Sequence, residues 1–228
     1  MLSRTQVTKA IAEVKPEIVL HLAAQPLVRE AYRDPLGTYA SNVMGTLHLL
    51  EVIRQTGGVK ACVLVTTDKV YANNEWAWPY RESEALGGHD PYSSSKACCE
   101  LVAQSFAASY FPVARYAEHG LAMATARAGN VLGGGDFAPD RLLPDILAAW
   151  TRGEPVTLRY PQAVRPWQHA LEPLAGYLQL AQGLYEQGCA FAGAWNFGPS
   201  DSDMCTVGEV VERLAQRWPQ APGLLIEP

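Results

Sequence analysis

Residues 61–67 read ACVLVTT, a short apolar run that ends in two threonines. A run of this kind, without polar alternation, is typical of a strand buried on both faces of a parallel sheet. Working outward along the chain, residues 18–22 (IVLHL) and 121–126 (LAMATA) have the same character. Helical spacing separates these runs, at residues 35–55 and 92–110. The alternation predicts an α/β fold with a doubly wound parallel sheet.

In such a sheet the active-site loops follow the carboxyl ends of the strands. We therefore expect functional residues in the loops at 23–26, 67–71 and 127–135. After residue 133 the pattern changes to short segments punctuated by Pro and Gly, with helices predicted at 142–152, 171–186 and 206–217. The sequence thus predicts two domains: residues 1–132 with the sheet and the catalytic residues, and residues 133–228 as a smaller substrate lobe interleaved with the last elements of the first domain.

A glycine-rich turn is missing from the start of the sheet. A sheet that binds a dinucleotide opens with a strand, a turn of three spaced glycines and a helix that holds the pyrophosphate. No such turn precedes His21, and the glycines at 133–135 come after the third predicted strand. The sequence therefore reads as a fragment that begins partway into its fold, and the segment 224–228 also ends abruptly.

The composition excludes several classes of protein. The chain has 228 residues, a formal net charge of −5 and 48% hydrophobic residues, which is typical of a globular domain. An acidic chain is a poor candidate for binding nucleic acid, and no apolar run is long enough to predict a membrane span or a signal peptide. Its five cysteines form no Cys-x-x-Cys pair, which favours free thiols in a reduced, cytoplasmic protein.

The segment Tyr92-Ser-Ser-Ser-Lys96 at the start of a predicted helix carries the strongest chemical signal. Residues spaced by four lie on one helix face, so the Lys96 ammonium would stand beside the Tyr92 phenol. A neighbouring positive charge lowers the pKa of a phenol, which lets the tyrosine hold and release a proton near neutral pH. Thr67, at the end of the preceding strand, would supply the hydroxyl that completes this group of three residues.

These residues and several longer stretches resemble one enzyme family. They are similar to the extended branch of the short-chain dehydrogenase/reductase superfamily, and within it to the CDP-glucose subfamily of the nucleotide-sugar 4,6-dehydratases. The stretches are residues 66–102 (TTDKVYANNEWAWPYRESEALGGHDPYSSSKACCELV), 127–145 (RAGNVLGGGDFAPDRLLPD), 165–182 (RPWQHALEPLAGYLQLAQ) and 194–199 (AWNFGP). The resemblance implies a Rossmann-like fold, NAD as cofactor and a lyase that uses transient oxidation at C4 of the sugar to remove water. It also implies a place in deoxysugar and lipopolysaccharide O-antigen synthesis.

The resemblance assigns roles to the two residues after Thr67. Asp68 would be the acid that protonates the departing 6-hydroxyl, because hydroxide is a poor leaving group. Related dTDP-sugar dehydratases have a second carboxylate next, as a base, where this chain has Lys69. Lys69 could remove the C5 proton only if burial or the nearby Lys96 kept it partly neutral; otherwise it would stabilise the enolate electrostatically.

Further site residues follow from the same resemblance. The substrate residues are expected to be Asn130, Arg141, Arg165 and Trp167, with Arg165 holding the diphosphate. His21 reads as a hydrogen-bonded core histidine, and no metal site is expected. The expected cofactor-binding residues are Ala23, Ala24, Gln25, Asn42, Thr66, Tyr92 and Lys96.

The helices at 35–55 and 92–110 are poor in charge, and the first has only Glu51 between Leu36 and Ile53. Such a helix is expected to be covered by the sheet on one side and by a partner subunit on the other, and members of the superfamily commonly pair there, so the chain is expected to form a homodimer. Thr67, Ser94 and Phe137 stand where close members have Ser, Asn and Trp. Two alternatives stay open: an NAD-dependent epimerase or reductase of the same fold, and a fragment without catalytic activity.

Overall fold

The computed structural model describes residues 3–76, 78–200, 203–222 and 224–226. Residues 227–228, at the predicted abrupt end, lie outside this described part. The chain forms two compact units. Unit 1 comprises residues 1–128 and 174–197, and unit 2 comprises residues 129–173 and 198–228. The predicted division at residue 132 differs from this boundary by four residues, and the segment 174–197 returns to the first unit.

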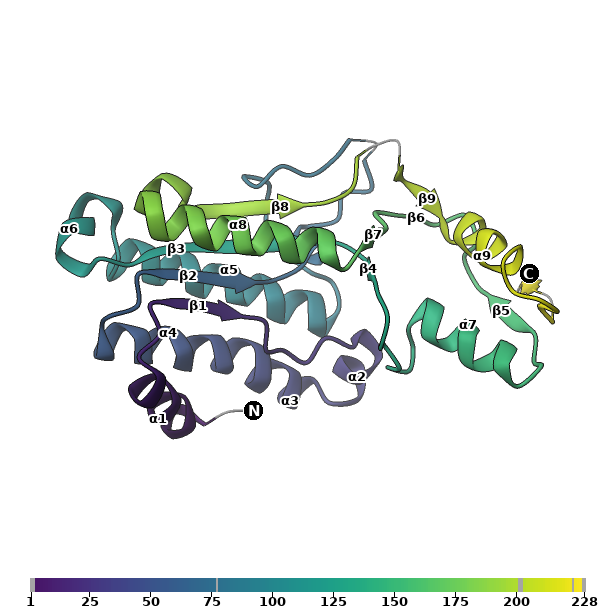
Figure 1. Cartoon of the computed structure of the whole chain (residues 1–228), viewed down its shortest axis with the longest axis horizontal. Helices are drawn as coiled ribbons and strands as arrows, with labels where there is room; N and C mark the ends of the chain where they lie inside the picture. The colour runs from purple at the N-terminus through teal and green to yellow at the C-terminus, as the bar shows by residue number, and fades with distance from the viewer. Residues whose placement is uncertain (1–2, 77, 201–202, 223, 227–228) are drawn as a thin grey trace. The chain divides into compact units, whose positions relative to one another are not determined.

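Unit 1 is built on a four-stranded parallel sheet (Figure 1). Its strands lie in the order β1-β2-β3-β8, with Leu20 of β1 opposite Val63 of β2, which lies opposite Ala124 of β3. The order confirms the predicted parallel sheet and adds a fourth strand that the sequence analysis did not identify. The strands are β1 (Ile18–His21), β2 (Ala61–Val65), β3 (Ala122–Ala128) and β8 (Gly193–Phe197).

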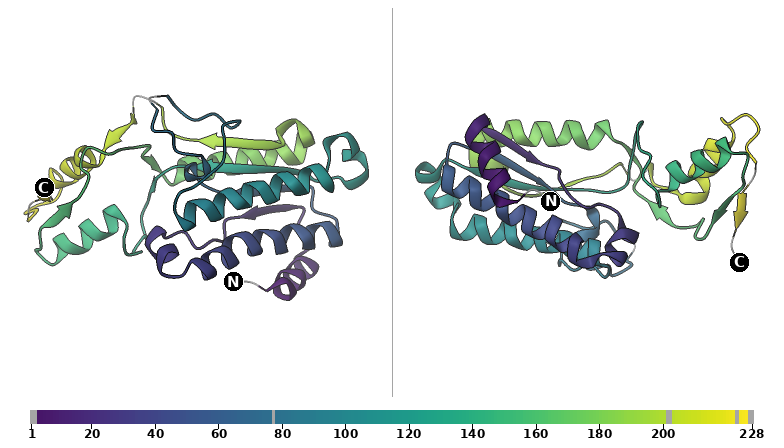
Figure 2. Two further views of the ribbon diagram at one scale, coloured as in Figure 1. Left: turned by 180° about the vertical axis from the view of Figure 1, so that it is seen from behind. Right: turned by 90° about the horizontal axis from the view of Figure 1, so that it is seen from below.

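Helices cover both faces of this sheet, as Figure 2 shows from behind and from below. On one face, α1 (Arg4–Val14), α4 (Gly45–Thr56) and α5 (Pro91–Ser109) pack on the strands through a core that includes Leu50, Leu64 and Phe106. On the other face, α8 (Leu171–Gln187) packs on the alanines of β3 through Leu180 and Leu184. Burial of apolar surface on two faces stabilises the unit at about 25 cal/mol per Å².

Strand β1 departs from its prediction. The IVLH run was expected to be buried on both faces, but Ile18 is 41% and Leu20 is 36% exposed. Val19 and His21, which alternate with them, are half-buried. Among the described residues, β1 is an edge strand with only β2 beside it, so one of its faces is covered less than the central strands are.

The predicted helix at 35–55 is one helical stretch interrupted by a π turn. It begins at Asp34, whose side chain accepts a hydrogen bond from the Gly37 N–H, and passes through α3 (Pro35–Tyr39), the π turn Ala40–Met44 and α4. It ends at Gly57, which has a φ of +66°, a backbone region that favours glycine. A short helix, α2 (Val28–Arg33), precedes it. Neither the π turn nor α2 is predicted by the hydrophobic pattern of the sequence.

Short elements complete unit 1. A 3₁₀ turn, Asp68–Val70, follows β2 directly. The remaining ones are the 3₁₀ turns Val113–Arg115 and Gly188–Phe191 and the helix α6 (Tyr116–His119).

Unit 2 has a small core around Ile146, Trp150, Leu158 and Val211. Its helices α7 (Leu142–Thr151) and α9 (Val207–Ala215) confirm two of the predicted helices. The strands form three two-stranded pairs: β4 (Val131–Leu132) with β7 (Gln168–His169), β5 (Val156–Leu158) with β10 (Leu224–Ile226), and β6 (Val164–Arg165) with β9 (Cys205–Thr206). Within the described part of the chain, no helix combines the length and the apolar character needed to cross a membrane.

Candidate active site

The loop after β1 is held in place by Asn42. The Asn42 side chain accepts a hydrogen bond from the Gln25 N–H (2.8 Å) and donates one to the Gln25 carbonyl (3.1 Å). The Gln25 side chain is itself committed to its surroundings, since it bonds both the Leu27 backbone and the Thr38 hydroxyl. Gln25 therefore shapes the loop that carries Ala23 and Ala24, and Ala23 leaves its small side chain exposed at the carboxyl edge of the sheet.

Asn42, in the π turn, also contacts α5. Its side-chain amide donates to the Ser95 hydroxyl at 2.9 Å. Its main-chain carbonyl accepts hydrogen bonds from the Thr46 hydroxyl (2.8 Å) and from the Cys99 thiol (3.2 Å). The same carbonyl also accepts the Gly45 N–H, so it stays bonded within its own helical stretch, and π turns are frequent at functional sites. Asn42 thus joins three segments: its own helix, the loop after β1 and α5.

Helix α5 places Tyr92 and Lys96 in the interior of unit 1. Asp90 caps the helix by accepting a hydrogen bond from the Ser93 N–H, and Pro91 occupies the first turn, where proline is favoured. Both Tyr92 and Lys96 are buried. The Lys96 ammonium donates to the main-chain carbonyl of Val65, the last residue of β2, at 3.0 Å. The predicted spacing therefore brings the amine to the strand end that leads into Thr67.

Burial shifts the pKa values of Lys96, His21 and Tyr177 in this part of unit 1. Desolvation lowers the pKa of Lys96, while Cys99 and Glu100 act in the opposite direction. Burial, together with the Lys96 charge, lowers the pKa of His21 to about 4, so this histidine is neutral at pH 7. Its Nε2 lies 3.2 Å from the Thr46 hydroxyl oxygen, in agreement with a hydrogen-bonded core histidine. Burial and the Tyr92 phenol raise the pKa of Tyr177, on α8, to about 12.

The turn after β2 carries Asp68, the predicted acid for the 6-hydroxyl, and Lys69, predicted to act on the C5 proton or the enolate. The Thr67 hydroxyl donates to the Asp68 carboxylate at 3.0 Å and accepts a weak hydrogen bond from the Lys69 N–H at 3.4 Å. Thr67 is buried and Asp68 is half-buried. The Lys69 side chain is exposed, so it lacks the burial that a neutral, proton-accepting lysine would need.

A buried ion pair beneath these residues was not predicted. Glu100 and Arg127 are both almost completely buried, and two hydrogen bonds join them, at 3.0 Å to Oε1 and 2.7 Å to Oε2. Arg127 was expected in a loop, but it belongs to β3, and its side chain lies in the core rather than facing substrate. An isolated acidic residue in the otherwise apolar segment 97–103 was the available signal, because buried charges require partners.

The predicted substrate residues belong to unit 2, where each has a local environment of its own. Arg141 precedes α7 and lies 3.7 Å from the Asp136 carboxylate. Arg165, in β6, is exposed, and its guanidinium donates to the Val164 carbonyl. The Trp167 indole donates to the Cys205 carbonyl at 3.1 Å, so it contributes to packing within the unit. The Asn130 carbonyl accepts a hydrogen bond from the Gln168 N–H, beside the β4–β7 pair.

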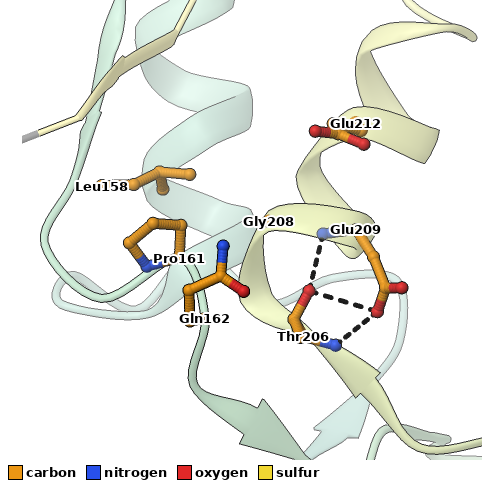
Figure 3. Close-up of a pocket in the computed structure, with 7 residues that line it drawn as sticks. All are labelled: Leu158, Pro161, Gln162, Thr206, Gly208, Glu209 and Glu212. Atoms are coloured by element: carbon orange, nitrogen blue, oxygen red, sulfur yellow. Dashed lines mark hydrogen bonds between the residues drawn. The ribbon is translucent and has the colours of Figure 1, made fainter.

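Unit 2 also contains a pocket of about 240 Å³ near the start of α9 (Figure 3). Its polar side includes Glu209, whose carboxylate accepts from the Thr206 N–H while the Thr206 hydroxyl accepts from the Glu209 N–H. This reciprocal pair is a capping box, which satisfies the first turn of the helix. None of the residues predicted to carry chemistry lines this pocket, so we assign it a structural role.

The loop after β1 and the start of α5 fit a nicotinamide dinucleotide in two respects. The small side chains of Ala23 and Ala24 allow close approach to the backbone at the carboxyl edge of the sheet, where parallel sheets of this class bind ligands. The buried Lys96 ammonium supplies positive charge and hydrogen-bond donors at the end of the adjacent strand.

Comparisons with known proteins extend these observations. The model of the NAD dependent epimerase/dehydratase family matches residues 1–188. The chain is 55% identical, over 209 residues, to the CDP-glucose 4,6-dehydratase of Salmonella typhimurium; the match covers 92% of this chain and 58% of that protein. The chain thus spans a little over half the length of this relative.

Solved structures agree in fold. The dTDP-glucose 4,6-dehydratase DesIV of Streptomyces venezuelae, with NAD and TYD bound, matches with a TM-score of 0.79 at 23% identity, covering 99% of this chain and 65% of that one. The UDP-glucose-4-epimerase of Stenotrophomonas maltophila, with bound NAD and formylated UDP-arabinopyranose, matches with a TM-score of 0.84 at 22% identity, over 99% and 68% of the two chains. The fold is therefore common to dehydratases and epimerases.

Proposed function

The chain belongs to the NAD dependent epimerase/dehydratase family, and from this membership we propose that it carries the catalytic centre of a lyase that converts CDP-glucose to CDP-4-keto-6-deoxyglucose and water. The observation that carries the proposal is Asp68, a carboxyl group that the Thr67 hydroxyl holds at the end of β2. Epimerisation of a sugar needs no acid for a leaving group, whereas loss of the 6-hydroxyl does. The 55% identity to a CDP-glucose 4,6-dehydratase supports the choice of nucleotide.

In this proposal Tyr92 removes the proton of the 4-hydroxyl. Thr67 positions the sugar hydroxyl, and the Lys96 ammonium, fixed on the Val65 carbonyl, stabilises the Tyr92 phenolate. NAD, held by the loop at Ala23–Gln25 and by Lys96, would accept the hydrogen of C4 as hydride and later return it at C6.

Asp68 then protonates the departing 6-hydroxyl. The C4 ketone makes the C5 proton acidic, so that a base other than Lys69 can remove it, while the 6-hydroxyl leaves as water with the proton from Asp68. Because the Lys69 side chain is exposed, we assign it the electrostatic role, in which its positive charge stabilises the developing enolate. In unit 2, Arg141 and Arg165 are proposed to bind the diphosphate, and Asn130 and Trp167 the rest of the substrate.

The assay is incubation of the chain with CDP-glucose and NAD⁺, followed by mass spectrometry and NMR of the product. A sugar nucleotide that has lost one water and carries a C4 ketone supports the proposal. Recovery of a C4 epimer of unchanged mass favours the second candidate, an NAD-dependent epimerase, which the epimerase of similar fold makes reasonable. Absence of both products, with no NAD binding by titration calorimetry, would identify a chain without catalytic activity.

Asp68→Asn separates the acid role from a structural one. The amide retains the size of the side chain but cannot donate a proton as a carboxylic acid does. We expect oxidation at C4 to persist, seen as NADH absorbance in a single turnover, while dehydration slows by about 10²–10⁴-fold. Equal loss of both steps would contradict the assignment. Tyr92→Phe is the reference variant, in which no reduced cofactor should accumulate.

Two further proposals accompany this activity. The charge-poor helical stretch from α3 to α4, together with α5, is proposed to form the interface of a homodimer. The five cysteines have free thiols in the structure, which supports the proposal that the protein works in the reducing cytoplasm. A role of the product in deoxysugar and lipopolysaccharide O-antigen synthesis follows only if the CDP-glucose activity is demonstrated.

A further inference from the structure

The buried Glu100–Arg127 pair uses nearly all its hydrogen-bonding capacity on different parts of the site. Besides the two bonds from Arg127, the Glu100 carboxylate accepts one from the Thr66 hydroxyl (2.5 Å) and one from the Thr125 hydroxyl (2.8 Å). Four donors match the four acceptor positions of a carboxylate. A charge taken out of water at this depth is costly unless it is satisfied in this way, so its partners are held strictly.

The pair reaches the loop after β2 through Arg127. Its guanidinium donates to the Tyr71 hydroxyl (2.8 Å) and to the Glu82 carbonyl (2.9 Å), and it lies over the Tyr71 ring at 5.0 Å. The Tyr71 hydroxyl donates in turn to the Asn196 side chain of β8 at 2.6 Å. The ion pair thus connects α5, β3, β8 and both ends of the turn that contains Thr67 and Asp68.

The Glu100–Arg127 pair lies close in the chain to the residues proposed to react. Glu100 lies one helical turn beyond Lys96 and two turns beyond Tyr92 on α5, and Thr66 immediately precedes Thr67. The end of β2 is therefore attached to α5 at two successive residues, by Lys96 at the Val65 carbonyl and by Glu100 at the Thr66 hydroxyl. Two attachments fix both the distance and the rotation of the strand end, whereas one would leave it free to turn.

We propose that the Glu100–Arg127 pair is a positioning element, which acts through Thr66 to set the Thr67 hydroxyl and Asp68 against Tyr92 and Lys96. In this scheme Glu100 and Arg127 touch no substrate, and the buried Thr66, which the resemblance assigned to cofactor binding, directs its hydroxyl to Glu100. The three residues fix the geometry of the groups that react. The inference rests on the proposed function, since it concerns the alignment of its catalytic residues. Misalignment by about 1 Å is enough to slow an enzymatic step by up to about 10²-fold.

Thr66→Val tests the proposal without breaking the ion pair. Valine has nearly the shape of threonine but removes the hydroxyl that links Glu100 to the strand end. Thr125→Val is the matched control, because it removes an equivalent hydroxyl bond to the same carboxylate from a residue outside the turn. Thr66→Ser restores the hydroxyl. In steady-state kinetics with CDP-glucose and NAD⁺, we expect Thr66→Val to lower kcat about 10- to 100-fold with an unchanged KM.

The control Thr125→Val and the rescue Thr66→Ser distinguish a positioning role of Thr66 from a general loss of stability. Both valine variants should lower the melting temperature by a similar few degrees, as loss of one buried hydrogen bond does. Only Thr66→Val should lower kcat, and Thr66→Ser should recover it to within about threefold. Equal kcat values for Thr66→Val and Thr125→Val would overturn the proposal.

A second readout does not depend on turnover. The chain has five lysines, so the Cε signals of ¹³C-labelled lysine can be followed through a pH titration, with Lys96 assigned by its loss in Lys96→Met. We expect Thr66→Val to shift the titration of Lys96 and Thr125→Val to leave it at the wild-type midpoint. If the wild-type chain fails to convert CDP-glucose, the proposed function is wrong, and the Lys96 titration alone tests the positioning role. Equal Lys96 titration midpoints in Thr66→Val and Thr125→Val would then overturn that role.

Discussion

Gly88 is the residue on which the start of α5 depends most closely. A Cβ atom at this position would lie 2.4 Å from the Ser93 carbonyl carbon and 2.5 Å from the Ser94 nitrogen, in the turn that carries Tyr92. These neighbours are backbone atoms, which cannot rotate away as a side chain can. The loop therefore reaches the helix only because residue 88 has no side chain.

Gly88→Ala should consequently impair both stability and catalysis. We expect the free energy of unfolding to fall by about 1–3 kcal/mol, the usual range for an overpacked site, and kcat to fall further than stability explains. Urea unfolding and the dehydratase assay measure the two effects. Gly87→Ala is the control, since a Cβ there would meet only Ala72 at an ordinary 3.6 Å. Equal behaviour of the two variants would contradict this reading of Gly88.

His21 should make the stability of unit 1 depend on pH in a defined window. Its pKa is about 4 in the folded chain against 6.5 for an unperturbed histidine, so the unfolded chain binds the proton more readily. Stability is therefore lost as the pH falls from about 6.5 to about 4, by up to about 3 kcal/mol. His21→Gln should remove this contribution, which urea unfolding at pH 7 and pH 4.5 would detect as a flatter pH dependence than in wild type.

For individual residues, the sequence predicts those site residues whose partners lie a few positions away or at the end of a recognisable strand. The spacing of Tyr92 and Lys96 and the position of Thr67 after a strand predict that these three act together, and Lys96 bonds the strand end that leads into Thr67. Glu100 and Arg127 were not grouped, because they lie 27 residues apart and only the register of α5 against β3 brings them together. The solvent exposure of the Lys69 side chain could not be predicted either, since it depends on the direction of the 3₁₀ turn after β2.

Among the elements, the π turn Ala40–Met44 contains the buried Asn42, which bonds several neighbouring segments. Its carbonyl accepts from the Gly45 N–H, the Thr46 hydroxyl and the Cys99 thiol, while its side chain bonds Gln25 and Ser95. Several elements therefore depend on one buried amide.

Asn42→Ala should loosen all these connections at once. We expect the free energy of unfolding to fall by about 2–4 kcal/mol, because the Gln25 backbone groups and the Ser95 hydroxyl lose their partner. Hydrogen exchange should show faster exchange in the loop at 23–27 than in β3. Asn74→Ala, at an exposed position, is the control and should change the unfolding free energy by less than about 0.5 kcal/mol. A loss in Asn42→Ala as small as in the control would exclude the proposed role of this amide.

The elements themselves were predicted where hydrophobic periodicity is strong. The strands β1, β2 and β3 and the helices α5 and α7–α9 lie close to their predicted bounds. Strand β8 (GAWNF) was missed because Gly193 and Asn196 interrupt its apolar pattern, and β1 was taken for a doubly buried strand because its composition does not reveal its place at the sheet edge. The short pairs of unit 2 are held by long-range pairing, which local sequence does not encode.

For the whole molecule, the proposed dimer gives a direct prediction. Leu36, on α3, is 83% exposed and Leu101, on α5, is 54% exposed, so both proposed interface helices carry uncovered apolar side chains. We expect sedimentation to give twice the chain mass of 24.8 kDa for the wild type and the chain mass for Leu101→Glu. Val14→Glu, at an exposed position of α1, should remain dimeric. A wild-type chain that sediments as a monomer would contradict the proposed dimer.

The division of the chain into two units was predicted from the sequence only in part. A second lobe interleaved with the last elements of the first domain was predicted from the change in pattern near residue 133, but which segment returns, 174–197, depends on β8 pairing with β3. The catalytic candidates belong to unit 1 and the substrate candidates to unit 2, so the two proposed roles can be mutated independently.

The contact between Lys96 and the Val65 carbonyl has a consequence for tolerance to mutation. Because the acceptor is a main-chain atom, no replacement of the Val65 side chain deletes it. A saturation library at residue 65 should therefore retain activity with any side chain that the sheet accommodates, while a library at residue 96 should lose it almost throughout. Genetic drift at the acceptor position would leave the chemistry untouched, a form of robustness that comes from anchoring a charge on the polypeptide itself.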